Sequence, residues 1–262
     1  MARIHLLFKG CIVCFVLLSM ISCKSDGPIR TFRDADFNAR WEFFMGDTQD
    51  PFGTELEASS WTRVHLPHDW SIMDYELQDT LHEGPFFKNL PGGADVGYLR
   101  NGTAWYRKAF ASPLGSENKR IILCFDGVSS QMELWVNGVL IGEHVYGYTP
   151  FYFDISSVIK EPGKMNMIAV KTANPGENSR WYAGSGVYRQ VKISMLYPVA
   201  VTPWGVHVTT PEVSEDRASI EFEIEVSNTL ESEVDVSGEI LIQTPDAQLV
   251  QMDIGEVSAG PA

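Results

Sequence analysis

Cysteine is scarce in this chain, which argues against a fold held together by disulfides. Only 4 of the 262 residues are cysteines, and three of them, Cys11, Cys14 and Cys23, lie near the N-terminus. The fourth, Cys124, lies inside the apolar run Ile121-Ile-Leu-Cys-Phe125. A free cysteine in such a run packs as a small apolar residue, so we expect Cys124 to be buried and to have no nucleophilic role.

Positive charge is scarce as well. The chain carries 20 Lys and Arg residues against 34 Asp and Glu residues, and its formal net charge is -14 at pH 7. Nucleic acid and an anionic membrane surface both repel such a chain, so neither is an expected partner. A neutral ligand such as a glycan is compatible with this charge.

The apolar run near the N-terminus is short. It extends from Cys11 to Ile21, follows basic residues and ends just before Cys23. A membrane-spanning helix needs about 20 apolar residues, whereas an export signal needs fewer and ends at a small residue. The pattern predicts a lipoprotein signal peptide over residues 1–22, with Cys23 as the acylated first residue of the mature chain. A single transmembrane anchor is the alternative.

Helical periodicity is nearly absent, and short apolar runs bounded by turn residues recur instead. Asn137-Gly138, between two such runs, predicts a tight hairpin turn. Strands are expected over residues 120–125, 131–136, 139–141, 165–172 and 187–194, with a short helical turn at 156–159. This pattern predicts an all-β sandwich.

The composition changes near Tyr197-Pro198, where aromatic residues become rare and acidic residues dense. Beyond this point, residues 219–226 alternate strictly between apolar and polar side chains, as a half-exposed antiparallel strand requires. We therefore expect a linker over residues 23–36, a first domain over 37–198 and a second domain over 199–262. The second domain resembles an immunoglobulin-like sandwich, yet only about four of roughly seven strands fit, so we expect it to be truncated.

Three stretches of the sequence contain clusters of side chains that are suited to binding a sugar: Leu66-Pro-His-Asp-Trp70, Gly97 to Arg107, and Asn178 to Arg189. Their glycines let the backbone approach a ligand closely, and Trp and Tyr offer flat apolar faces with a polar tip. The third cluster, which contains Arg180-Trp-Tyr182 followed by Ala-Gly-Ser-Gly186, indicates a ligand-facing loop that leads into a strand.

Together with Leu134-Trp-Val-Asn-Gly138 and Gly147-Tyr-Thr-Pro-Phe-Tyr-Phe-Asp154, these clusters resemble the N-terminal sugar-binding domain of glycoside hydrolase family 2 in order and spacing. The resemblance spans about Phe37 to Leu196, and the acidic region after it resembles that family's immunoglobulin-like domain. Within the family, the motifs most resemble the β-galactosidases of gut Bacteroidetes. The resemblance implies a jelly-roll, galactose-binding-like first domain, and catalysis by two glutamates of a separate (β/α)8 barrel in a retaining reaction.

The resemblance also implies a set of substrate contacts. Asp69 is placed to accept hydrogen bonds from sugar hydroxyls, although it could equally cap a turn while Trp70 fills the core. Asn101 falls where some members present an Asn to the terminal sugar, and a plain turn at Asn101-Gly102 is the alternative. The set is completed by Arg180, Trp181 and Tyr182. Trp105, Tyr106 and Trp135 have apolar neighbours and are assigned to packing.

No catalytic residue, metal or cofactor is expected in this chain. Some family members hold a metal through an acidic residue near the third cluster, where this sequence has Arg180. The glutamates of residues 221–233 fall on a solvent-facing strand and its turn, where they favour solubility.

The sequence therefore predicts the non-catalytic N-terminal portion of a β-galactosidase-like hydrolase, shortened by a frameshift, a premature stop or an incomplete gene model. Its expected ligand is a β-galactoside or related glycan. We expect an outer-membrane lipoprotein, attached only through the Cys23 lipid and facing the periplasm or the cell surface. Two alternatives are a free-standing surface glycan-binding lipoprotein and a split enzyme whose barrel is a separate chain.

Overall fold

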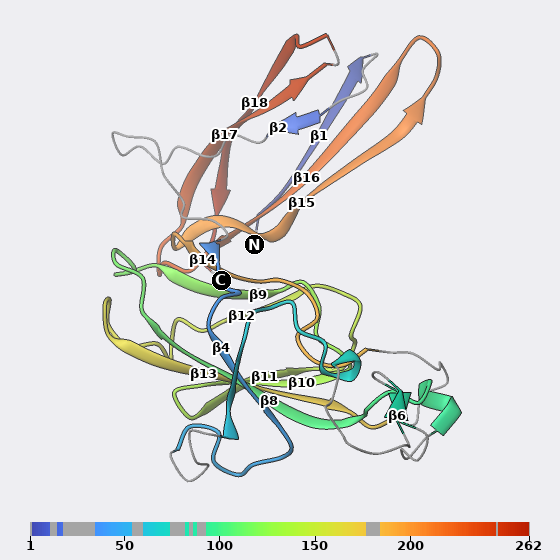
Figure 1. The fold of residues 1–262 in the computed structure, drawn as a ribbon. Helices are drawn as coiled ribbons and strands as arrows, with labels where there is room; N and C mark the ends of the chain where they lie inside the picture. The colour runs from blue at the N-terminus through green and yellow to red at the C-terminus, as the bar shows by residue number, and fades with distance from the viewer. Residues whose placement is uncertain are drawn as a thin grey trace. The chain divides into compact units, whose positions relative to one another are not determined.

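The computed structural model describes residues 2–10, 15–17, 35–53, 60–73, 82–83, 86–87, 93–176, 184–244 and 246–261. The chain divides into two compact units, Phe32–Met195 and Leu196–Ala262 with Met1–Thr31 (Figure 1). The described strands of each unit pair in antiparallel fashion. The predicted all-β class is confirmed. The described part of the chain contains no helix with the length and apolar character needed to cross a bilayer.

The unit Phe32–Met195 contains two antiparallel sheets, one of six strands in the order β11-β10-β13-β8-β4-β5 and one of four in the order β12-β9-β14-β3. The strands of the larger sheet are β4 (Trp41–Met45), β5 (Thr62–Val64), β8 (Gly102–Ala111), β10 (Gln131–Val136), β11 (Val139–His144) and β13 (Met165–Asn174). Those of the smaller sheet are β3 (Ala35–Asp36), β9 (Arg120–Phe125), β12 (Phe151–Asp154) and β14 (Val191–Leu196). The hairpin β6 (His82–Glu83) and β7 (Phe86–Phe87) and the 3-10 helices η2 (Trp70–Ile72) and η3 (Gly93–Val96) lie in the connections.

One apolar core joins these two sheets. Side chains alternate along β8, so Ala104 and Tyr106 enter the core while Trp105 and Arg107 do not. Residues from β9, among them Leu123 and Phe125, enter the same core. The unit is therefore a β-sandwich, and Cys124 is buried, as the sequence predicts.

A second apolar cluster holds the remaining large aromatics of the six-stranded sheet. It contains Trp61, Trp105 and Ala169, with Phe44, Phe52 and Trp135 packed against them. The Arg107 guanidinium carbon lies 4.0 Å from the centroid of the Trp61 ring, and its Nε donates to Glu42 over 2.7 Å. Packing is thus confirmed for Trp105, Tyr106 and Trp135, which lie in two separate clusters.

The turn between β10 and β11 has the predicted geometry. Asn137 and Gly138 both adopt positive φ, 51° and 85°, and Val136 pairs with Val139 across the turn. Such a turn matches the right-handed twist of the two strands it joins, which is why Asn-Gly is a reliable hairpin signal.

The strand predicted over residues 187–194 begins later than expected. Strand β14 starts at Val191, because the preceding backbone groups bond to loops instead of to a neighbouring strand. The Val187 carbonyl accepts from the His68 amide over 2.8 Å, and Gly186 bridges to Ser129.

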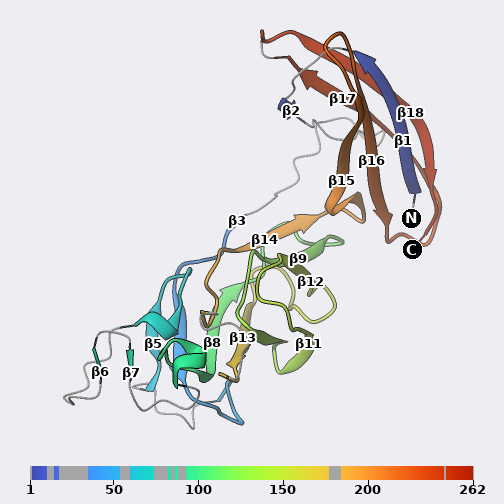
Figure 2. The ribbon, with the colours of Figure 1, turned by 90° about the vertical axis from the view of Figure 1, so that its right-hand side faces the viewer.

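The other unit contains two three-stranded sheets, β1-β16-β15 and β18-β17-β2. Its strands are β1 (Ala2–Gly10), β2 (Phe15–Leu17), β15 (Val199–Val213), β16 (Ala218–Asn228), β17 (Val234–Gln243) and β18 (Leu249–Ala259). In Figure 2, β1 lies beside β16, with Ala2 opposite Val226 and Gly10 opposite Ala218. The predicted alternation in β16 is confirmed, because Ile220, Phe222, Ile224 and Val226 are buried in one core.

Candidate functional site

Two segments that are far apart in the sequence are joined by hydrogen bonds at the candidate site. Residues 184–187 lie along the segment Leu66–Ile72 and form hydrogen bonds with it. The His68 amide donates to the Val187 carbonyl over 2.8 Å, and the Trp70 amide donates to the Ser185 carbonyl over 3.1 Å. In the opposite direction, the Ser185 amide donates to Asp69 Oδ1 over 3.0 Å. The first and third motifs found in the sequence therefore lie together.

Asp69 has a structural role in this arrangement. Its Oδ1 caps η2 by accepting from the Ser71 amide over 2.9 Å and from the Ser71 hydroxyl over 2.5 Å, in addition to the Ser185 amide. Trp70 is completely buried in the core. The turn-capping interpretation of Asp69 is thus confirmed. A carboxylate has two oxygens and can accept several hydrogen bonds, so a contact with sugar is compatible with this role and stays a prediction.

Gly186 is required where the two segments cross. Its φ is +102°, and an added Cβ would lie 2.3 Å from Tyr106 Oη, 2.8 Å from Trp70 Cδ1 and 2.9 Å from the His68 carbonyl oxygen. Any larger residue would separate the segments. This close approach explains the glycine-rich sequence that the motif presents.

His68 is the residue before Asp69 in the chain. Its Nδ1 is 2.8 Å from Tyr106 Oη, and its buried Nε2 has no hydrogen-bond partner. Burial lowers the pKa of His68, an effect that the neighbouring Asp69 carboxylate partly opposes. The imidazole is therefore neutral near pH 7. Its contact with Tyr106 stabilises the loop without adding a charge.

Asn101 and Gly176 are in close contact. A Cβ added to Gly176 would lie 2.0 Å from Asn101 Nδ2. Arg180, Trp181 and Tyr182, and also Cys23, lie outside the described residues. The two described ends of the segment that contains Arg180 are nevertheless placed, since Gly176 lies against Asn101 and Ser185 bonds to Asp69.

Sequence reasoning missed Asn174, which holds both ends of that segment. Its Nδ2 donates to Ser185 Oγ over 2.8 Å and to the Gly184 carbonyl over 3.2 Å, and its Oδ1 accepts from the Gly176 amide over 3.2 Å. The available signal was the sequence Asn174-Pro-Gly176, because Asn commonly bonds to the backbone of a turn that it starts.

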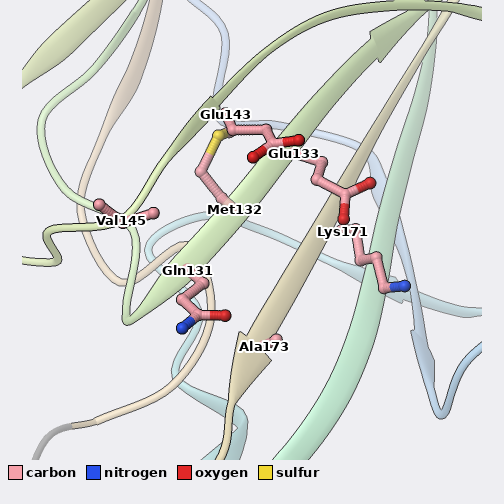
Figure 3. A pocket seen from close by; sticks show the side chains of 7 residues that line it. All are labelled: Gln131, Met132, Glu133, Glu143, Val145, Lys171 and Ala173. Atoms are coloured by element: carbon pink, nitrogen blue, oxygen red, sulfur yellow. The ribbon is translucent and has the colours of Figure 1, made fainter.

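A small cavity of about 80 Å³ lies on the six-stranded sheet (Figure 3). Its lining side chains are Gln131, Met132, Glu133, Glu143, Val145, Lys171 and Ala173, none of them a predicted site residue. Glu133 faces Glu143 across β10 and β11, and Lys171 Nζ pairs with Asp47 at 3.1 Å and points away from the cavity.

Within the ranges that the structure describes, no three His, Cys, Asp or Glu side chains are grouped so that they could hold a metal ion. What the described site offers is hydrogen bonding.

Comparison with known proteins agrees with this chemistry. The family described as "Glycosyl hydrolases family 2, sugar binding domain" matches residues 37–200. The β-galactosidase BoGH2A of Bacteroides ovatus is 34% identical over 224 residues, which are 84% of this chain and 24% of that protein. A β-glucuronidase of Bacteroides fragilis is 28% identical over 82% of this chain and 28% of its own. The chain thus spans about a quarter of these relatives.

The solved structures give the same result for the fold. A glycosyl hydrolase family 2 member from Bacteroides cellulosilyticus superposes with a TM-score of 0.74 at 31% sequence identity. The superposition covers 87% of this chain and 30% of that one.

Proposed function

Because the chain belongs to glycoside hydrolase family 2, we propose that it provides the sugar-binding, non-catalytic portion of a β-galactosidase-like glycosidase. The observation that carries the proposal is the match of residues 37–200 to the sugar-binding domain, together with 34% identity to a β-galactosidase over most of the chain. The relatives described above are glycosidases, so the comparisons do not favour a free-standing glycan-binding protein.

In this proposal the chain binds and orients the substrate, and glutamates outside it perform the chemistry. Asp69 accepts hydrogen bonds from sugar hydroxyls, Arg180 donates to sugar oxygens, and Trp181 stacks on the ring. Asn101 and Tyr182 complete the set. The bonds of Asn174 to Gly176 and Ser185, and of Asp69 to Ser185, support this assignment, because they fix the described residues on either side of the segment.

The test is a chimera in which this chain replaces the corresponding N-terminal region of the Bacteroides ovatus enzyme. We expect the chimera to hydrolyse p-nitrophenyl β-galactoside in preference to the β-glucuronide. This chain alone should hydrolyse neither. Hydrolysis by the chain alone, or a chimera that prefers the glucuronide, would contradict the proposal. Co-purification of a barrel-type glycosidase with the chain would indicate that the catalytic part is a separate polypeptide.

We further propose that the chain is exported and anchored through a lipid on Cys23. The support is the order of basic residues, short apolar run and small residue before Cys23. Expression with radiolabelled palmitate should label the wild-type chain in the membrane fraction, and Cys23→Ser should abolish the label. Equal labelling of both would contradict the proposal.

A further inference from the structure

We propose that Tyr146, Tyr148, Tyr188 and Arg189 form a second saccharide-binding surface, made of other residues than the substrate contacts around Asp69. We call these four residues the tyrosine platform. The proposal rests on family membership and on the geometry below, and not on the substrate role of Asp69.

Two tyrosine rings of the platform are open to solvent. Tyr146 is 56% exposed and Tyr148 is 50% exposed. Their ring centroids are 5.7 Å apart and their planes meet at 70°. Exposed large side chains usually occur singly and need no explanation, but two tyrosines that pack on each other and still present half their surface form a patch.

Three contacts stabilise the loop that carries these rings. Tyr188 Oη donates to the Gly147 carbonyl over 2.7 Å. Gly147 packs so closely on Ser129 that an added Cβ would lie 3.3 Å from the Ser129 Cα. At the start of the loop, His144 stacks on Phe151 with ring centroids 3.8 Å apart. A preorganised loop loses little conformational entropy when it binds a ligand.

Arg189 adds hydrogen-bond donors beside the rings. Its guanidinium carbon lies 5.3 Å from the centroid of the Tyr188 ring, and its Nη1 donates to the Asp126 carbonyl over 3.4 Å. Burial raises the pKa of Tyr188, an effect that the nearby Arg189 partly opposes and the nearby Tyr148 reinforces. The Tyr188 phenol is therefore neutral at physiological pH, as its donation to the Gly147 carbonyl requires.

These features together fit a neutral saccharide. Tyrosine rings present apolar faces for the C–H groups of a pyranose, while phenol and guanidinium groups bond to its hydroxyls. The chain's net charge of -14 disfavours an anionic ligand. Exposed aromatic grooves also bind proline-rich peptides, so that class serves as the competing outcome.

The experiment is isothermal titration of the full chain with β-linked galactotetraose. We expect saturable binding to the wild type, and binding at least about tenfold weaker for Tyr146→Ala and for Tyr148→Ala, because each removes one stacking face. Tyr152→Ala, at another exposed tyrosine, is the matched control and should bind within twofold of the wild type. Asp69→Asn removes a contact of the first site and leaves the platform intact, so a loss of affinity in the platform variants that Asp69→Asn does not share is assigned to the platform.

Three results would overturn the proposal. The first is no detectable binding to the wild type, and the second is unchanged affinity in both platform variants. The third is loss of binding in Asp69→Asn alone, which would place the saccharide at the first site. Titration with a proline decapeptide completes the design, because binding of that peptide but not of the saccharide would show a peptide surface. Unfolding midpoints of every variant confirm that the fold is retained.

Discussion

Asp69 and Asp154 form the same local turn. Each accepts from the amide and hydroxyl of the serine two residues later, at 2.9 and 2.5 Å for Asp69 and at 3.0 and 2.5 Å for Asp154. The sequence predicts such a turn from Asp-x-Ser alone. Asp69 also accepts from the Ser185 amide, whose residue lies 116 positions away in the chain, whereas Asp154 pairs with Arg120 at 2.8 Å. That part of the site could not be predicted from local sequence.

At the same scale, Gly186→Ala should destabilise the sandwich unit by at least about 3 kcal/mol, because the new Cβ would clash with Tyr106, Trp70 and the His68 carbonyl at an unfavourable φ. Gly138→Ala is the matched control. It also has a positive φ but no atom within 4 Å of the new Cβ, so it should cost only about 1 kcal/mol. Denaturant unfolding measures both, and equal losses would refute the close approach.

The lowered pKa of His68 predicts a loss of stability on acidification. The folded state binds the proton less tightly than the unfolded state, whose histidine titrates near about 6.5. The contribution is therefore fully present above that pH and is lost as the pH falls through the lowered folded value. Between pH values of about 7.5 and 5, the unfolding midpoint of His68→Gln should fall less steeply than that of the wild type. The exposed His65→Gln is the control, and parallel slopes for the wild type and His68→Gln would contradict the prediction.

At the scale of elements, the strands with a clear pattern were predictable and their connections were not. The Asn137-Gly138 hairpin and the alternation of β16 follow from local rules. The late start of β14 does not, because Gly186 and Val187 bond to Ser129 and His68 across the fold. Long-range pairing of a loop leaves no periodic signal in the sequence.

The Asn166 side chain, at the start of β13, forms hydrogen bonds with residues in several connections between strands. Its Nδ2 donates to Ser112 Oγ over 2.8 Å and to the Lys164 carbonyl over 3.1 Å. Its Oδ1 accepts from Asn137 Nδ2 and from the Lys160 amide, both over 2.9 Å. The side chain is only 2% exposed, so Asn166→Ala would leave buried donors unpaired.

We therefore expect Asn166→Ala to cost about 2 to 4 kcal/mol in the free energy of unfolding. Glu117→Ala, at an exposed loop position, should cost less than about 0.5 kcal/mol. Chemical denaturation measures both values. A cost for Asn166→Ala as small as that of the control would show that water replaces the network.

At the scale of the whole molecule, the chain has two units with separate cores. Phe222 is completely buried in the core of the unit that contains β15 to β18. Phe222→Ala should destabilise that unit by about 3 to 5 kcal/mol. Calorimetry should then show one transition moved to lower temperature and the transition of the sandwich unit unchanged, whereas a shift of both together would show that the units unfold as one.

We propose that this chain contributes sugar contacts to a glycosidase. The KM of the chimera for p-nitrophenyl β-galactoside measures this contribution. Asp69→Asn keeps an oxygen to cap η2 and removes the charge, and Asp154→Asn makes the same change in the same turn elsewhere. We predict a KM at least about tenfold higher for Asp69→Asn, equivalent to about 1.4 kcal/mol, and an unchanged KM for Asp154→Asn. Equal KM values in the two variants would contradict it.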